Sequence, residues 1–267
     1  MATNIHPSAI VSQTATLAQG CTIGPYCIVG DKVAIGSGTR LQSHVVIDGN
    51  TTIGQNCEIF PFACVGKQTQ DLKYRGGLGP VEIGDNTTLR EYVTVHTPTD
   101  PDGLTKIGNA CHILAYSHIA HDCVLGNRII MSNGTNLGGH VVVEDAVVFG
   151  GLCGVHQFVR IGTMAMLGAM SKATQDIAPY SLAEGNPAVP RMVNKVGLSR
   201  NGLDDDRVRA IVKAHKLLFH AGLTQGEALE QLEYQLGQLP EIEHLIAFAQ
   251  SSERGLARPK LQKGKNQ

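Results

Sequence analysis

The sequence contains no tryptophan, and aromatic residues make up only 4% of its 267 residues. Charged residues are also scarce, at 17%, and the formal net charge is −1. A near-neutral chain has no overall electrostatic attraction for nucleic acids or membrane surfaces, which excludes a globally basic binder. No apolar run reaches the roughly 18 residues that a membrane span requires. The N-terminus lacks the basic and apolar segments of a secretory signal, so we expect a cytoplasmic protein with reduced cysteines.

The abundant residues are small and aliphatic. Hydrophobic residues make up 42% of the chain, and glycine occupies 31 positions. Low charge together with many Val, Ile and Leu residues argues against disorder, and the lack of a Gly-X-Y period excludes collagen. The composition therefore indicates a folded protein whose core is built from small and aliphatic side chains.

An apolar residue recurs at every sixth position from Ile5 to Ala173. Only Asp71, Gly77 and Pro101 interrupt the series, and they lie in two gaps. A period of six fits neither an α-helix nor a plain strand, but it is the period of a hexapeptide parallel β-helix. Since three hexads close one triangular coil, the sequence predicts a mainly β fold of about ten coils.

Two other positions of the hexad are informative. The residue directly after the apolar one is glycine in twelve repeats, for example Gly24 and Gly162, and we expect positive φ angles at these corners. Cys64 lies off the pattern and receives no role, and no CxxC pair indicates a metal site or a disulfide. The small position, four after the apolar one, holds the six cysteines that we expect to be buried: Cys21, Cys27, Cys57, Cys111, Cys123 and Cys153.

The two gaps, 66–80 and 96–106, return in phase with the repeat. We therefore predict that they are loops ejected on the outside of the solenoid, where binding residues often lie. The period ends near residue 174, and a proline-containing connector follows. These features divide the chain into a β-helix domain, 1–190, and a C-terminal helical domain, 191–267, with a basic end.

Three helices are predicted in the second domain. Thr224 and Glu227 form a capping-box pattern that opens a second helix through about Gln235, and Pro240 starts a third that ends near Gln250. These helices could cap the solenoid or dock on a neighbouring subunit. The first helix is indicated by an apolar stripe at helical spacing: Val208, Ile211, Val212, His215, Leu218 and Phe219.

Eleven histidines stand out in a chain with so few charges. Because residues one coil apart lie one above another, His121 should stack on Gly139, and Asp122 on His140. With His156 nearby, this predicts a polar edge on an otherwise aliphatic prism. Solvated surface histidines and a zinc site are the alternatives, since imidazole also suits zinc.

The arrangement favours general-base chemistry. Histidine can take a proton from a hydroxyl near neutral pH, which is the role we assign to His121. The adjacent Asp122 could orient the ring and stabilise the imidazolium. The backbone N–H of Gly139, one coil further on, could meet a developing oxyanion. No nucleophilic serine or cysteine is needed if two substrates react directly.

Five segments carry a resemblance to a known family that goes beyond the repeat itself. They read QDLKY, LAYSHIAHDCVLGN, NLGGHV, GVHQFVRIG and VNKVGLSRNGL, in this order along the chain. Together they resemble the bacterial UDP-N-acetylglucosamine O-acyltransferases of lipid A biosynthesis, which are hexapeptide-repeat enzymes, and the match extends over essentially the whole chain.

The resemblance implies a left-handed β-helix in a homotrimer that needs no cofactor and no metal. It implies transfer of a (3R)-3-hydroxyacyl group from acyl carrier protein to the 3-hydroxyl of UDP-N-acetylglucosamine, without a covalent acyl-enzyme. His121, Asp122 and Gly139 then keep the catalytic roles given above. The implied substrate contacts are Asp71 and Lys73 from a neighbouring subunit, His118, His140, His156 and Gln157 at the sugar and acyl cleft, and Asn194 and Arg200 at the phosphates.

Two positions bear on specificity. Asn201 stands where family members often carry a second basic residue, which predicts weaker phosphate contacts. Ala169 falls where the family sets acyl length, and its small side chain favours a longer chain. The acidic carrier protein should meet a basic patch drawn from these candidates: Arg160, Lys172, Arg207, Arg209, Lys213 and Lys216.

Two other functions were weighed. The related N-acyltransferase of the same pathway acts on an amino sugar nucleotide and carries an extra N-terminal domain, whereas the repeat here begins at Ile5. A non-enzymatic solenoid, such as an ice-binding one, needs a flat and regular threonine face. The histidine edge and the helical tail argue against that function.

Overall fold

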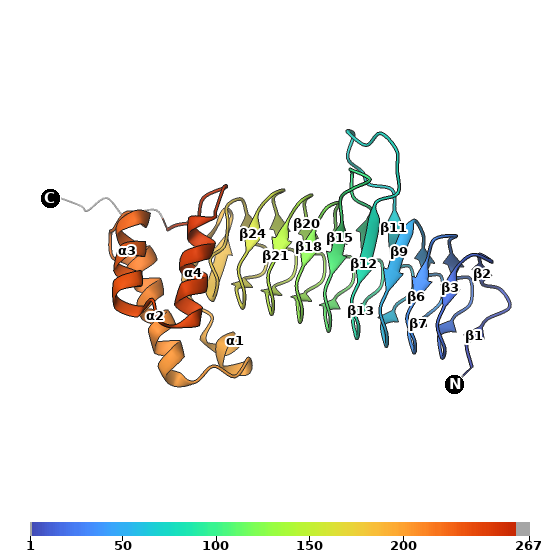
Figure 1. Ribbon diagram of the computed structural model, residues 1–267, viewed down its shortest axis with the longest axis horizontal. Coiled ribbons are helices and arrows are strands. Elements are labelled where there is room, and N and C mark those ends of the chain that lie inside the picture. The colour runs from blue at the N-terminus through green and yellow to red at the C-terminus, as the bar shows by residue number, and fades with distance from the viewer. Residues whose placement is uncertain (1, 260–267) are drawn as a thin grey trace.

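The computed structural model describes residues 2–259, so most of the predicted basic end, 260–267, lies outside the described part. The chain winds into a long triangular prism of short strands, with the helices packed at the C-terminal end of the prism (Figure 1). Parallel strands form three sheets along the prism. The first sheet holds β1 (Asn4–Ile5), β4 (Thr22–Ile23), β7 (Arg40–Leu41), β10 (Glu58–Ile59), β13 (Thr88–Leu89), β16 (His112–Ile113), β19 (Ile130–Met131), β22 (Val148–Phe149), β25 (Met166–Leu167), β27 (Ser181–Gly185) and β28 (Ala188–Val193).

The other two sheets have the same construction. The second holds β2 (Ile10–Val11), β5 (Ile28–Val29), β8 (Val46–Ile47), β11 (Cys64–Lys67), β14 (Thr94–His96), β17 (His118–Ile119), β20 (Asn136–Leu137), β23 (Gly154–Val155) and β26 (Lys172–Ala173). The third holds β3 (Thr16–Leu17), β6 (Ala34–Ile35), β9 (Asn50–Ile53), β12 (Pro80–Ile83), β15 (Thr105–Ile107), β18 (Val124–Leu125), β21 (Val142–Val143) and β24 (Arg160–Ile161).

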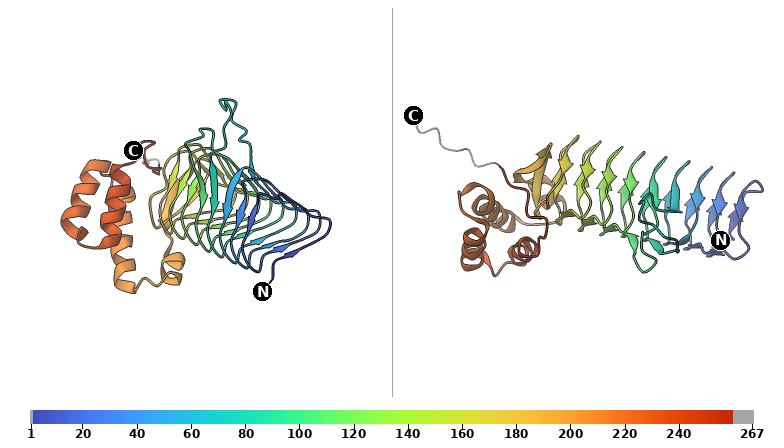
Figure 2. Two further views of the ribbon diagram at one scale, coloured as in Figure 1. Left: turned by 45° about the vertical axis from the view of Figure 1, so that its right-hand side comes forward. Right: turned by 90° about the horizontal axis from the view of Figure 1, so that it is seen from above.

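The register confirms the predicted coil. Ile5 pairs with Ile23 in parallel, one coil of three hexads further along the chain. The repeated apolar residue points inward in each coil, and from Ile23 onward it is buried. The coils stack one on another along the axis of the prism (Figure 2), so the inward column of Ile, Val and Leu forms one continuous core.

The corners differ from the sequence prediction. Glycine after the apolar residue seldom has positive φ: Gly66 does, but Gly24 and Gly162 do not. A Cβ on Gly24 would lie 2.4 Å from the carbonyl oxygen of Gln42 in the next coil, so these glycines permit close stacking. Positive φ falls two residues later and is adopted by non-glycine residues such as Tyr26 (58°). The turn at each corner, rather than glycine, therefore sets this conformation.

The cysteines follow the prediction. All seven are free, and the six at the small hexad position are buried. Burial raises the pKa of the Cys123 thiol to about 12, and its Sγ–H donates to the carbonyl oxygen of Gly138 at 3.1 Å. Cys64 lies on β11 and is only partly buried. The six buried thiols are therefore packing groups, as small hydrophobes would be.

Two loops project from the prism near β11, β12 and β15 (Figure 1). They are shorter than predicted, because β11 continues to Lys67, β12 begins at Pro80 and β15 begins at Thr105. The loops therefore comprise residues 68–79 and 97–104. Each loop leaves the coil at a corner and returns in register, as the pairing of Ile53 with Ile83 shows.

The C-terminal part contains more structure than predicted. An antiparallel hairpin, β27 and β28, extends the first sheet, so the expected boundary after residue 190 falls inside β28. A short helix follows, α1 (Lys195–Arg200). The three predicted helices are present as α2 (Asp205–His220), α3 (Gln225–Leu236) with the Thr224–Glu227 capping box, and α4 (Pro240–Gln250). Among residues 2–259, no helix is both long and apolar enough to cross a membrane.

Polar contacts fix the helices to the prism. His244 Nε2 of α4 lies 2.7 Å from the Glu144 carboxylate at a prism corner, and this hydrogen bond raises the pKa of His244. The Arg160 guanidinium lies 4.2 Å from the ring centre of Phe248 and donates to Ser251. Arg160 is therefore a docking residue for α4.

Candidate active site

His121 and Asp122 lie at the corner that follows β17. His121 Nδ1 is 2.8 Å from Asp122 Oδ2, and both side chains are largely buried. Because the carboxylate can only accept, Nδ1 donates and Nε2 is left free as the proton acceptor. Asp122 has a φ of 60°, the corner conformation described above, which turns its carboxylate back onto the preceding ring.

The second loop holds Asp122 in place. The backbone N–H of Thr99 donates to Asp122 Oδ2 at 3.0 Å. The hydroxyl of Thr105 in turn accepts the backbone N–H of Asp122 at 2.9 Å. The loop 97–104 thus orients the carboxylate that orients His121.

Gly139 packs directly against the His121 ring, as the coil arithmetic predicted. A Cβ at this position would lie 2.3 Å from His121 Cε1 and 2.4 Å from Nε2. Only glycine leaves room for the ring. None of the hydrogen bonds among residues 2–259 uses the Gly139 N–H, so this donor is available.

The first loop brings Asp71 to the same place. Asp71 Oδ2 lies 3.9 Å from His121 Nε2 and accepts the Thr99 hydroxyl at 3.2 Å. The backbone N–H of Lys73 donates to Oδ1 and is the main reason that the pKa of Asp71 is lowered. The resemblance assigned Asp71 and Lys73 to a neighbouring subunit, but Asp71 here adjoins the His121 of its own chain.

A cleft of about 340 Å³ lies beside His121, Asp71 and Lys73. His118 on β17 lines it, with Nδ1 2.7 Å from the Thr94 hydroxyl. Burial and the nearby histidines lower the pKa of His118 to about 4, so its ring is neutral at pH 7. The full lining is Gln70, Asp71, Lys73, His96, His118, Ala120, His121 and Gln157.

His96 is one of three lining residues, with Gln70 and Ala120, that were not predicted from the sequence. It ends β14 beside a register irregularity between β11 and β14, and it is buried. In the sequence it marks the start of a gap, which gave no reason to connect it with His118. Thr94 pairs with His118, 24 residues further along the chain and beyond the second loop, and this pairing brings His96 beside His118.

A second cavity of about 530 Å³ adjoins the cleft, since His118 and Ala120 line both. It continues toward the C-terminal end of the prism, past His156 to Met170 and Lys172. Its walls are mainly apolar, with Leu137, Leu152 and Val155 contributing. Ala169 is exposed at the corner next to Met170 but does not itself line this cavity.

His140 has a different position. Its ring stacks on Phe158, with ring centres 4.5 Å apart, and its Nε2 lies 3.8 Å from Asp122 Oδ2. It lines neither cavity and lies behind the carboxylate.

His121, Asp122 and His140 place donor atoms within 4.8 Å of one another, so they could hold a cation. Asp122 Oδ2, however, already accepts two N–H groups, which leaves it a poor ligand.

Asn194 and Arg200 are not brought to His121. Asn194 caps α1, where its side chain accepts from the Gly197 N–H and donates to the Met164 carbonyl. Its side chain is therefore committed to the fold, and Arg200 lies at the exposed end of α1.

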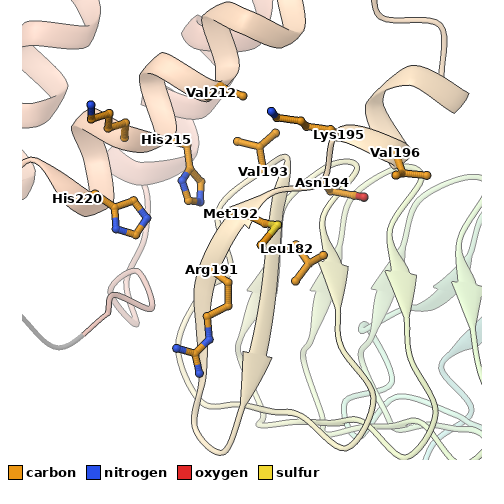
Figure 3. Close-up of a pocket in the computed structure, with 11 residues that line it drawn as sticks. Leu182, Arg191, Met192, Val193, Asn194, Lys195, Val196, Val212, His215 and His220 are labelled. Atoms are coloured by element: carbon orange, nitrogen blue, oxygen red, sulfur yellow. The ribbon is translucent and has the colours of Figure 1, made fainter.

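A separate cavity of about 430 Å³ lies between β28 and α2, and Asn194 is at its edge (Figure 3). His215 reaches into it from α2 toward Met192 of β28. Burial lowers the pKa of His215 to about 4. The cations Arg191, Lys195 and Lys216 surround apolar walls that include Val193 and Val212.

Comparisons with known proteins agree on the family. Residues 176–257 match the family described as UDP N-acetylglucosamine O-acyltransferase, domain 2, and residues 14–49 and 104–139 match the bacterial transferase hexapeptide family. The chain is 48% identical to the acyl-[acyl-carrier-protein]–UDP-N-acetylglucosamine O-acyltransferase of Thermodesulfovibrio yellowstonii, over 95% of this chain and 99% of that protein.

Solved structures show the same similarity. LpxA from Acinetobacter baumannii superposes with a TM-score of 0.92 at 43% identity, covering 95% of this chain and 99% of that one. The UDP-N-acetylglucosamine O-acyltransferase (LpxA) from Moraxella catarrhalis gives 0.91 at 42% identity with the same coverage. The predicted fold class, a hexapeptide β-helix with C-terminal helices, is confirmed. The chain belongs to the UDP-N-acetylglucosamine O-acyltransferase family.

Proposed function

We propose that this protein transfers a (3R)-3-hydroxyacyl group from acyl carrier protein to the 3-hydroxyl of UDP-N-acetylglucosamine, the first step of lipid A biosynthesis. The observation that carries the mechanism is the His121–Asp122 pair, with its free Nε2 in a cleft large enough for a sugar ring. The names of the relatives support the identity of both substrates.

In this mechanism His121 Nε2 takes the proton of the sugar hydroxyl as the oxygen attacks the acyl thioester. Asp122 stabilises the imidazolium that forms. The Gly139 N–H meets the negative charge on the former carbonyl oxygen. When the tetrahedral intermediate collapses, the carrier thiolate leaves and receives the proton from His121. No residue of the chain becomes acylated.

The sugar nucleotide is assigned to the cleft beneath the first loop. Asp71, His118 and Gln157 surround His121 there and can contact the sugar hydroxyl and acetamido groups. Lys73 lines the same cleft and offers a cation to a phosphate. Arg200 remains the candidate for the nucleotide phosphates, by resemblance. Asn194 would act by holding α1 in place, since its own amide is already bonded.

The acyl chain is assigned to the second cavity. Its walls are mainly apolar, and it begins at His118, which also lines the sugar cleft. Met170 lies at its far end, and the exposed Ala169 precedes Met170 at the same corner. His156 lines this cavity rather than the sugar cleft.

The carrier protein would dock on the cavity between β28 and α2. Of the six basic candidates, Arg160 contacts α4, Arg207 pairs with Glu241, and Arg209 pairs with Asp206. Of the other three, Lys172 lines the second cavity and Lys213 is exposed on α2, whereas Lys216 lies at the cavity between β28 and α2. Lys195 and Arg191, two cations that were not predicted from the sequence, line the same cavity. Cations around an apolar depression suit an acidic helix with an apolar side.

We also propose the homotrimer. Tyr26, His44, Phe62, Tyr92 and Tyr116 stack along one edge of the prism, with neighbouring ring centres 4.9–5.1 Å apart. Tyr26 and Tyr116 are 61% and 63% exposed in the single chain. An exposed apolar edge of this length supports burial against other copies.

The free cysteines fit a reducing compartment, which supports a cytoplasmic location.

The direct test is an acyl-transfer assay with UDP-N-acetylglucosamine and carrier proteins that bear 3-hydroxyacyl chains of several lengths. Transfer to the 3-hydroxyl supports the proposal, and no transfer from any chain would overturn it. A parallel reaction with the 3-amino sugar nucleotide identifies the acceptor: preference for the amine would replace O-acylation by N-acylation.

A further inference from the structure

His118 is held from a single strand, β14. The Thr94 hydroxyl lies 2.7 Å from its Nδ1, which commits that nitrogen and leaves Nε2 to face the cleft. Two residues along the same strand, the His96 ring meets the His118 ring edge-on, with centres 4.9 Å apart at 73°. The first contact anchors one edge of the ring, and the second fixes its plane.

His96 makes no side-chain hydrogen bond to any residue in the described part of the chain, although it is only 7% exposed. Its contact with His118 is therefore a packing contact between rings. Burial and the nearby His121 also lower the pKa of His96, which favours the neutral ring. The facing residue one coil further on is Ala120, whose small side chain leaves space for the imidazole.

We infer that His96 is a positioning residue for the acceptor sugar, which acts by holding the His118 ring in the orientation that contacts the substrate. This inference rests on the proposed function, in which His118 contacts the sugar. His96 itself takes no part in proton transfer. Its role is in binding, so its loss should appear in KM rather than in kcat.

The first experiment compares three variants by KM for UDP-N-acetylglucosamine and by kcat. Edge-to-face ring pairs are worth little individually, so His96→Ala should raise KM about fivefold to tenfold and change kcat less than about threefold. His96→Phe keeps an edge-on ring and should restore KM to within about twofold of the wild type. His112→Ala, which removes an exposed histidine on β16, is the matched control and should change neither constant.

The second experiment tests whether His96 acts through His118. In a His118→Ala background, His96→Ala should raise KM by less than about twofold, because the contact is already lost. Multiplicative effects of the two substitutions, or failure of His96→Phe to restore KM, would overturn the inference. The inference would also be overturned if His96→Ala lowered kcat and the amount of folded protein equally and left KM unchanged.

A third measurement separates this inference from the proposed function. Imidazole ¹⁵N spectra of the intact protein report which ring nitrogen of His118 carries the proton. His96→Ala should shift the His118 ring signals, because the ring loses the contact that fixes its plane, whether or not the wild type transfers acyl groups. An unchanged His118 signal would overturn the positioning role, whereas absent transfer by the wild type would overturn only the proposed function.

Discussion

Gly139 lies against the His121 imidazole so closely that a Cβ would fall 2.3 Å from Cε1. The Gly139 N–H was expected to meet a developing oxyanion. The structure gives this glycine an additional role, because the general base itself occupies the space that a side chain would need.

Gly139→Ala should therefore displace the His121 ring and lower kcat about 100-fold or more, since a shift of about 1 Å in a reacting group costs this much. The fold should survive, because Gly139 does not have positive φ. Gly151→Ala is the matched control at the same corner position, where a Cβ would meet only the Asn133 oxygen at 3.5 Å. Acyl-transfer rates and circular dichroism check both variants. Equal activity of the two would contradict the packing argument.

Asp122→Asn should lower kcat without removing the loop contact, because the amide oxygen can still accept the Thr99 N–H. A neutral amide cannot stabilise the imidazolium, but it leaves the base in place. We therefore expect kcat to fall by less than the roughly 10²–10⁴-fold that a general base typically contributes. Asp102→Asn, an exposed loop substitution, is the control. An Asp122→Asn enzyme with wild-type kcat would show that the carboxylate has only a structural role.

Ala169→Met should shift the preferred acyl donor toward shorter chains. Each buried methylene is worth about 0.8 kcal/mol, so discrimination should change about fourfold for each carbon that no longer fits. Ala115→Met places the same side chain at the equivalent corner position nearer the N-terminus and should leave the preference unchanged. Competition among carrier proteins of different chain length measures the shift. An unchanged preference in Ala169→Met would place the acyl terminus elsewhere.

His215 should make the helical region sensitive to acid. Its pKa is about 4 in the fold and about 6.5 in the unfolded chain, so the unfolded state binds more protons between these values. Stability is therefore present above pH 6.5 and is lost as the pH falls toward 4. At pH 5 the lowered pKa of His215 should reduce the free energy of unfolding by on the order of 2 kcal/mol.

His215→Phe keeps a ring and removes the proton site. Its free energy of unfolding in urea should fall less between pH 7 and pH 5 than that of the wild type. His244 acts in the opposite direction, because its raised pKa adds stability at low pH, but both proteins share it. An equal loss in both proteins would show that His215 is not the acid-sensitive group.

The sequence predicts the prism well because its packing is local and periodic. One inward aliphatic residue per hexad, as at Ile23, is enough to specify the coil, and stacking at a fixed interval places Gly139 on His121 and His140 beside Asp122. The capping box of Thr224 and Glu227 is equally local, and α3 begins where it predicts. These predictions succeed because the residues involved are separated by a fixed number of positions.

Predictions failed where geometry depends on contacts between distant residues. Positive φ falls at Tyr26 rather than Gly24, because stacking of the coils, and not the turn, requires glycine there. The β27–β28 hairpin is specified by pairing onto β25, which no periodicity marks. His96 was missed because the second loop changes the spacing between β14 and β17, whose pairing brings it to His118.

The measurement that tests the mechanism most directly is the turnover number of His121→Ala with UDP-N-acetylglucosamine and 3-hydroxyacyl carrier protein, compared with the wild type. The variant should keep its circular dichroism spectrum and its oligomeric mass while losing nearly all turnover, by about 10²-fold or more. Retention of more than about a tenth of the wild-type turnover would mean that the substitution lowers turnover less than about tenfold. This loss is well below the usual contribution of a general base, so it would show that His121 does not have that role.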